Sequence, residues 1–168
     1  MKKIIIIALS LLFTLAATAQ EVKFGHINKQ SVLEVMPEAD EAQRQLEDMQ
    51  LKYKLQIKAM EEEMTKKQQE YQEQADTLDA TIRRYKETEL QRLYQSYEEF
   101  GKSAQETLGK KYQELMAPIE AKINKAVEQV GKTQGFFYIF DVTTPGTFAY
   151  ISDKSVDVLP LVKKELGL

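Results

Sequence analysis

Apolar residues in the middle of the chain recur at steps of three and four positions, separated by glutamate, lysine and glutamine. The pattern runs almost without interruption from Glu38 to Val130. Alternating steps of this kind predict a narrow coiled-coil seam, not the broad apolar face of a helix in a globular core. The predicted seam residues are Leu46, Met49, Tyr53, Ile57, Met60, Met64, Tyr71, Ala75, Leu78, Ile82, Tyr85, Leu90, Tyr94, Tyr97, Ala104, Leu108, Tyr112, Leu115, Ile119, Ile123, Ala126 and Val130.

A helical segment of this length favours a hairpin. One continuous helix would be roughly 140 Å long at 1.5 Å per residue, whereas a single fold-back gives arms of roughly 60–70 Å. The fold-back is predicted between Asp76 and Arg83, where Asp76, Thr77 and Asp79 can each cap a new helix. The arm is therefore expected to span residues 38–130, with its tip near 76–83.

Two glycines and a proline interrupt the predicted returning helix. Each of Gly101 and Gly109 costs roughly 1 kcal/mol relative to alanine in a helix interior. They indicate either a close approach of two helices or a soft point at which the arm bends. Pro118 is expected to kink the helix, and the segment Gly131–Gly135 to end it.

The two ends of the chain have a different pattern. "EVKFGHIN" (21–28) and "FFYIFD" (136–141) predict strands, and "TFAYIS" (147–152) predicts another, which follows either as a hairpin or after a wider loop. One or two helical turns follow the first strand, Pro37 suits the first turn of the long helix, and "SVDVLPLVKKELG" predicts a short final helix. The fold class is therefore α+β, mainly α, with residues 20–37 and 131–168 forming a β-rich body from which the antiparallel helical hairpin projects.

The strand at 136–141 is apolar on both of its predicted faces. By the two-residue period, Phe136, Tyr138 and Phe140 share one face, and Phe137 and Ile139 share the other. Both faces need cover, and the rest of one chain covers only part, so the body is expected to be an oligomer core. The residues assigned to that core are Phe24, Ile27, Phe136, Tyr138, Phe140, Phe148 and Tyr150.

The N-terminus predicts export. Lys2 and Lys3 precede an apolar run from Ile4 to Ala17, and Ala17-Thr18-Ala19 is a cleavage pattern. Residues 1–19 therefore resemble a secretory signal peptide cleaved after Ala19, rather than a membrane anchor, for which the run is short. Cleavage would lower the net charge from −3 to −5, and the chain has no cysteine, so packing alone must hold an exported fold together.

The residue types required for catalysis are sparse. The single histidine, His26, lies on a predicted strand without a partner, and "GKTQGFF" lacks phosphate-loop spacing. No catalytic, cofactor-binding or metal-binding residue is assigned, and no cofactor is expected. The acidic balance also argues against nucleic-acid binding, which requires phosphate neutralisation.

The order of these segments resembles the Skp (OmpH) family of periplasmic outer-membrane-protein chaperones over nearly the whole chain after residue 19. The matching segments are "VKFGHIN", "VLEVMPE", the long polar hairpin, "YIFD" before "FAYIS", and "DVLPLVKKELG". Asp157, Val158, Pro160, Val162 and Leu166 fit the family's ending, whereas Leu159 replaces a usual threonine. The resemblance implies a homotrimer with a small β-barrel-like body, whose three arms enclose a cavity and hold unfolded outer-membrane proteins without ATP. Some relatives are basic, and this acidic chain argues against direct membrane binding.

A holdase needs adaptable and individually weak contacts, which tyrosine, methionine and glutamine provide. Any one of the arm residues could instead simply pack in the seam. The alternative function is an envelope coiled-coil scaffold or adaptor with one fixed partner, which would favour regular apolar heptads without internal glycines. The possible client contacts on the arms are Tyr53, Met60, Met64, Tyr71, Tyr85, Tyr94 and Tyr97.

Overall fold

A computed structural model describes residues 22–168, so the predicted signal peptide lies outside the described residues. The chain divides into two compact units. Residues 30–125 form one unit, which we call the arm. The other unit, which we call the body, contains residues 126–167 and the described residues before position 30. The fold is mainly helical, with a small set of strands near the two ends of the chain, as the sequence predicts.

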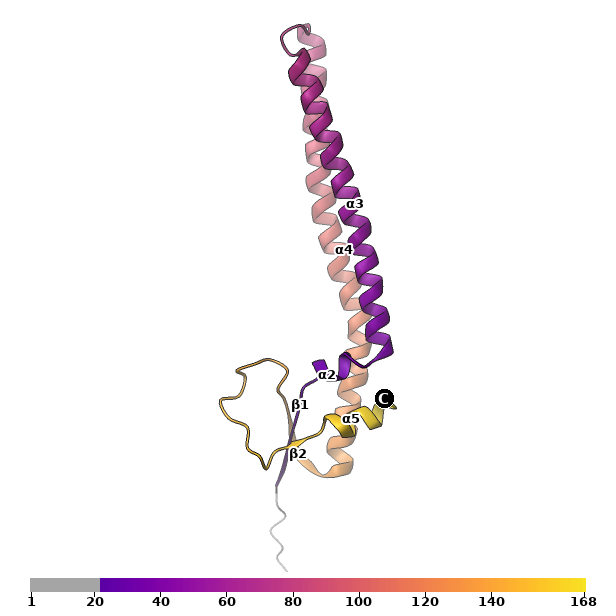
Figure 1. The fold of residues 1–168 in the computed structure, drawn as a ribbon, viewed down its shortest axis with the longest axis vertical. Helices are drawn as coiled ribbons and strands as arrows, with labels where there is room; N and C mark the ends of the chain where they lie inside the picture. Colours follow the sequence, from indigo (N-terminus) through magenta and orange to yellow (C-terminus); the bar gives the residue numbers. More distant parts are fainter. Residues whose placement is uncertain (1–21) are drawn as a thin grey trace, which may run out of the picture. The chain divides into compact units, whose positions relative to one another are not determined.

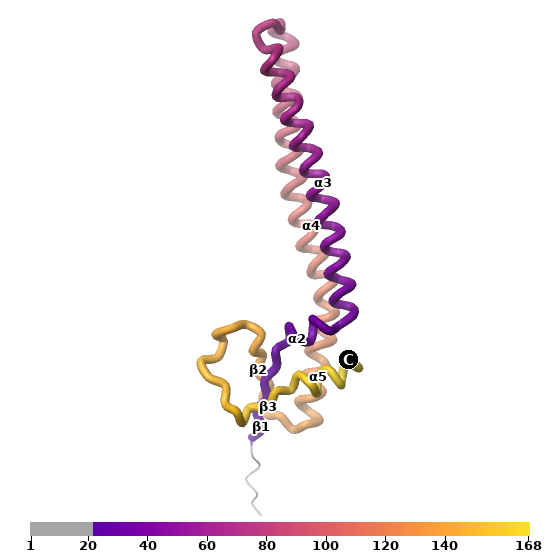
Figure 2. The backbone as a smooth tube through the Cα atoms, viewed as in Figure 1, coloured from indigo at the N-terminus to yellow at the C-terminus, as the bar shows by residue number. Residues whose placement is uncertain are grey.

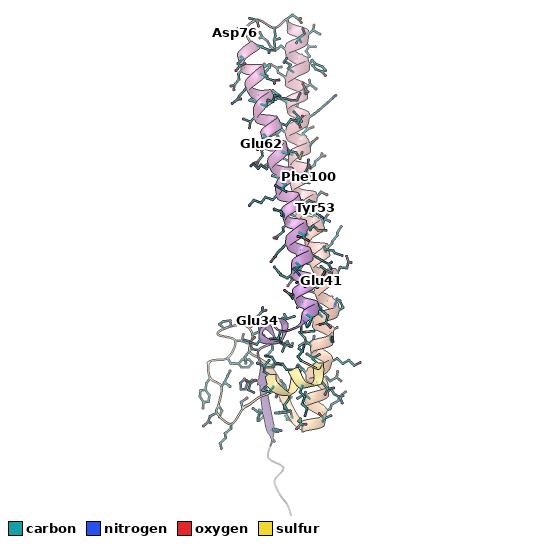
Figure 3. The ribbon with its side chains drawn as sticks, turned by 45° about the vertical axis from the view of Figure 1, so that its right-hand side comes forward. Glu34, Glu41, Tyr53, Glu62, Asp76 and Phe100 are labelled. Atoms are coloured by element: carbon teal, nitrogen blue, oxygen red, sulfur yellow. The ribbon has the colours of Figure 1, made fainter. Side chains whose placement is uncertain are left out.

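The arm is an antiparallel pair of long helices, preceded by the single turn α2 (Gln30–Leu33). Helix α3 spans Pro37–Gln74 and α4 spans Ala80–Gln134, the last residues of which belong to the body. Figures 1 and 2 show the two helices side by side, running in opposite directions from the turn that joins them. The rings of Tyr53 and Phe100 meet edge to face at 5.8 Å, midway along the pair (Figure 3).

The fold-back occupies residues 75–79, at the beginning of the predicted interval. One carboxylate oxygen of Asp79 accepts hydrogen bonds from the backbone N–H groups of Thr81 at 2.8 Å and Ile82 at 3.1 Å. Asp79 is therefore the cap of α4, and the helix begins directly after it. Of the three proposed capping residues, Asp79 makes this contact.

The arm buries side chains only near its base. The buried residues of this unit are Val32, Met36, Ala42, Leu46, Ala104, Ile119 and Ile123. Between residues 47 and 103, all of which the structure describes, no residue is buried, and the seam positions are at most half-buried. The distal arm is therefore two helices joined by a thin stripe of contacts, as the narrow seam predicts.

The glycines of α4 are not places of close helix approach. A Cβ atom added at Gly101 or at Gly109 would meet no other atom within 4 Å. Packing within the chain therefore does not require glycine at either position, and the soft point stays a prediction. Pro118 lies inside α4, which continues through it.

We expect the double variant Gly101→Ala, Gly109→Ala to be more stable than the wild type by about 2 kcal/mol, from the helix propensities alone. Urea unfolding followed by circular dichroism measures this gain. Gly25→Ala is the matched control, because its Cβ would lie 3.0 Å from Val158 and 3.1 Å from Phe136. An unchanged or lower stability of the double variant would show that the glycines are required by contacts.

The body contains a three-stranded parallel sheet in the order β2-β1-β3. Strand β1 (Lys23–Ile27) lies in the centre, between β2 (Phe136–Asp141) and the two-residue β3 (Val156–Asp157). Helix α5 (Leu159–Leu166) follows. The buried side chains of this unit are Ile27, Ala126, Val130, Val158 and Val162.

The strand predicted at 147–152 is not present. Residues 142–155 instead form a wide loop between β2 and β3, seen on one side of the strands in Figure 2. Because β2 and β3 flank β1 and run parallel to it, the connection crosses over the sheet and cannot be a tight hairpin. The last strand pairing joins Gly25 to Val156, a residue of the segment predicted to form the final helix.

Local hydrogen bonds set the ends of the two body helices. Helix α4 continues through Gly131 and ends at Gln134, directly before Gly135, whose φ of 69° is the left-handed conformation that glycine adopts readily. At the start of α5, the N–H of Leu159 donates to the Asp157 carboxylate at 2.9 Å. The N-cap residue itself, Val158, makes no side-chain capping bond, so this contact from Asp157 is the side-chain hydrogen bond at the start of the helix.

Candidate functional site

An aromatic face covers one side of the body sheet. We give this name to Phe24, Phe137, Tyr138, Phe140 and Phe148, all of which are exposed in the single chain. Phe24 stacks on Tyr138 at 6.4 Å and on Phe140 at 6.3 Å, and Phe140 meets Phe148 at 5.4 Å. The exposed fraction of Tyr138 is 56%. Aromatic rings that contact one another yet remain open to solvent indicate a surface for association.

Phe136 does not belong to this face, and its predicted placement beside Tyr138 and Phe140 is wrong. Lys23 pairs with Phe136, but the next residue, Phe24, pairs with Tyr138, so β2 contains one extra residue at position 137. This bulge reverses the alternation of side chains. Phe136 therefore lies against Gly25, on the side of the sheet where Ile27 is buried.

The other predicted core residues fall into two groups. Ile27 is buried within the chain, whereas Phe24, Tyr138, Phe140, Phe148 and Tyr150 remain exposed. All of the exposed members except Tyr138 line a cavity of about 740 Å³ beneath the loop 142–155. Its apolar lining includes Phe24, Phe140, Phe148, Tyr150 and Ile151.

Polar contacts hold both ends of this loop to β1 and the residues that follow it. At its start, Lys29 pairs with Asp141 at 3.1 Å, and the backbone N–H of Lys29 donates to Thr143 Oγ1 at 2.9 Å. At its end, His26 Nδ1 lies 2.9 Å from Ser155 Oγ. The sole histidine therefore positions the loop.

The ion pair between Asp141 and Lys29 makes the stability of the body depend on pH. Partial burial raises the pKa of Asp141, but hydrogen bonds from Thr143 and the Lys29 ammonium outweigh it and hold the pKa below its ordinary value. A carboxyl group of this kind stabilises the folded state above its unfolded pKa of about 3.9, and loses that contribution as the pH falls through the folded value.

We therefore expect the melting temperature of the protein to fall as the pH drops below about 4. Asp141→Asn should be less stable near neutral pH and should lose part of this acid dependence. Thermal unfolding followed by circular dichroism across the acid range measures both effects. Asp153→Asn, in the same loop, is the control and should follow the wild type; equal slopes for the two variants would contradict the role of Asp141.

The predicted client contacts on the arm also fall into two groups. Tyr53, Met60, Met64, Tyr71 and Tyr97 are half-buried in the seam. Tyr85 and Tyr94 are outside it, with 68% and 53% of their surfaces exposed. Tyr94 borders a groove of about 320 Å³ together with Met64 and Leu90, drawn from both helices.

Tyrosine and lysine side chains connect the distal helices by polar contacts. The hydroxyl of Tyr97 donates to Glu61 at 2.8 Å, and that of Tyr71 donates to Glu87 at 2.6 Å. These hydrogen bonds to carboxylates raise the pKa of both phenols above its ordinary value. A further contact joins Lys67 to Glu89 at 2.5 Å.

Two exposed apolar residues of the arm were not predicted. Leu51 and Leu55 remain 55% and 59% exposed. Each lies two positions from Tyr53, which places it about 160° around the helix from that seam residue. The two leucines are therefore on the side of α3 away from the seam. Their spacing of four, out of phase with the seam, was the signal that could have identified them.

The described residues offer few other chemical features. Within residues 22–168, no three or more carboxylate or imidazole side chains gather into a potential metal site. In the same range, no helix combines the length and apolar character needed to cross a membrane.

The fold and its surfaces define a class of protein: a long helical hairpin and a small parallel-sheet body, both carrying exposed aromatic side chains. The chain belongs to the OmpH-like outer membrane protein family, whose model matches residues 23–166. This family consists of periplasmic chaperones, in agreement with the resemblance drawn from the sequence. No curated protein sequence is significantly similar to the chain.

Proposed function

We propose that this protein is an ATP-independent periplasmic holdase that binds unfolded outer-membrane proteins between the arms of a homotrimer and keeps them soluble for insertion. The proposal includes export by the N-terminal segment and cleavage after Ala19. Family membership supports the general function. The distal arm supports the mechanism, because between residues 47 and 103 it buries no side chain yet exposes several large apolar ones.

The chemistry of the arm suits many weak contacts. Leu51, Leu55, Tyr85 and Tyr94 each leave roughly half or more of their surface available. Covering apolar surface is worth roughly 25 cal/mol per Å², so one such side chain adds little and several together retain a client. The surrounding carboxylates and lysines keep the unoccupied arm soluble. Such a surface recognises unfolded, apolar-rich chains without demanding a particular sequence.

The direct experiment dilutes a urea-unfolded outer-membrane β-barrel into buffer containing the purified protein and no nucleotide. We expect light scattering to be suppressed at a stoichiometric excess of trimer, and the barrel to remain competent for insertion into detergent or lipid. Aggregation at the rate seen without the protein would contradict the proposal and would favour a scaffold with one fixed partner.

Burial, not long-range charge, is expected to dominate client capture. Charges on the surface are screened beyond roughly 8 Å at physiological salt, and the chain is net negative. We therefore expect client affinity to change only a few-fold between low salt and about 0.5 M salt. Replacing Arg83, Arg84 and Lys86 together by glutamine should have a similarly small effect. A loss of a hundredfold or more, with the trimer intact, would show that electrostatics recruits the client.

A further inference from the structure

All the methionines that the structure describes belong to the arm. They are Met36, Met49, Met60, Met64 and Met116. Cysteine and methionine are the side chains that hydroperoxides oxidise most readily, and this chain has no cysteine. Met36 is only 2% exposed, whereas the other four are half-buried. The arm therefore holds the oxidisable sulfur of the described chain, in one shielded and four partly open positions.

Met60 and Met64 provide the apolar part of the seam in the distal half of α3. Between Ile57 and Tyr71 they are the only large apolar residues of this helix. Their spacing of four places both side chains on the same face. Glu62, labelled in Figure 3, lies between them in the sequence and marks this level of the arm. Over this stretch, the apolar contact of α3 with α4 thus depends on two thioethers.

Polar contacts between the helices flank the methionine pair. On one side the Tyr97 hydroxyl donates to Glu61 at 2.8 Å, and on the other side Lys67 pairs with Glu89 at 2.5 Å. Solvent-exposed polar contacts of this kind contribute little to stability. The apolar contact made by the methionines is therefore the principal attraction between the two helices at this level.

The two methionine side chains are within reach of small oxidants. Met64 lines the groove of about 320 Å³ together with Leu90 and Tyr94. This groove is much larger than the roughly 30 Å³ that a water molecule occupies in the liquid, and hydrogen peroxide is only slightly larger than water. No residue between positions 47 and 103 is buried, so the distal arm does not shield Met60 either.

We propose that Met60 and Met64 are an oxidation site, at which a hydroperoxide converts both thioethers to sulfoxides and thereby loosens the distal arm. With hydrogen peroxide, the sulfur attacks one oxygen, the O–O bond breaks and an S–O bond forms. The sulfur loses two electrons, and the other oxygen leaves with both protons as water. A sulfoxide is polar and is stabilised by hydrogen bonds with water, so it disfavours burial in the seam. Sulfoxide reductases restore thioethers, which makes such a modification reversible.

The site requires neither the proposed trimer nor a bound client, so its test uses the purified full chain alone. Limited treatment with hydrogen peroxide, followed by peptide mass spectrometry, measures the oxidation rate of each methionine. We expect Met60 and Met64 to oxidise several-fold faster than the buried Met36. Amide hydrogen exchange of the oxidised protein should then become several-fold faster in residues 57–71 and 87–100, and should stay unchanged in the body.

Leucine variants identify which methionines are responsible. The double variant Met60→Leu, Met64→Leu keeps the apolar volume without sulfur, so peroxide should leave hydrogen exchange in its arm unchanged. Met49→Leu, Met116→Leu removes the other two half-buried methionines and is the matched control, which should respond as the wild type does. Met60→Gln, Met64→Gln places polar side chains in the seam at similar helix propensity, and its distal arm should exchange rapidly without peroxide.

Three results would overturn the inference. Oxidation of Met60 and Met64 as slow as that of Met36 would show that the seam shields them. Complete oxidation at both positions with unchanged hydrogen exchange in the arm would show that the thioethers do not hold the helices together. Loosening of the arm by peroxide in the variant Met60→Leu, Met64→Leu would reject this pair as the site.

Discussion

Replacing Phe140 with aspartate is expected to convert the proposed trimer into monomers at micromolar concentration. In the single chain, Phe140 is at the centre of the aromatic face, with ring contacts to Phe24, Tyr138 and Phe148. If copies of the chain cover this face, a carboxylate at position 140 is placed in a dry contact without a partner, at a cost of several kcal/mol per subunit.

The fold of the monomer should survive this change, because the buried residues Ile27, Val158 and Val162 are not among the ring partners of Phe140. Analytical ultracentrifugation gives the oligomeric state, and far-UV circular dichroism shows whether the helices remain. Tyr85→Asp, which puts the same charge on an exposed aromatic position of the arm, is the matched control and should stay trimeric. A folded trimer of Phe140→Asp would show that the aromatic face is not the oligomer core.

Shortening the arm is expected to leave the proposed trimer folded and to reduce its capacity for large clients several-fold. Deleting residues 57–70 together with 87–100 removes two heptads from each helix, which preserves the seam phase and shortens the arm by about 21 Å. The deletion removes Tyr94 and the contact between Tyr97 and Glu61, but retains the Asp79 cap and the buried base of the arm.

The measurement compares the molar excess of protein that prevents aggregation of a small and of a large unfolded barrel. A smaller cavity should affect the large client more than the small one, and sedimentation should confirm that the shortened protein is still a trimer. Unchanged protection of the large client would move the binding site from the arms to the body.

The sequence predicts the arm well, because apolar residues recur at the same steps of three and four positions along both of its helices. Met60 and Met64 recur at the seam spacing, and both are half-buried in the structure. Asp79 was among the proposed caps, since aspartate before an apolar periodic run is a local signal. The position of the tip within that interval depended on which of several polar residues caps the helix, and composition alone does not decide among them.

The body could not be predicted to the same degree, because its contacts are non-local. A single extra residue at Phe137 reverses the face on which Phe136 lies, and only the pairing with β1 reveals it. Residues 147–152 have the composition of a strand but no partner in their own chain. Strand formation depends on an available edge as much as on propensity, so a sequence pattern alone overestimates the strands.

The central claim is that the arms hold the client, and a position-specific photocross-link to a bound client tests it most directly. A photoactivatable label is attached to a single cysteine at Tyr94 on the arm, and in a second sample at Lys154 in the body loop, and each trimer is loaded with a urea-diluted outer-membrane barrel. We expect client adducts from Tyr94→Cys and few or none from Lys154→Cys. Adducts from the body position alone, with aggregation still suppressed, would contradict the account.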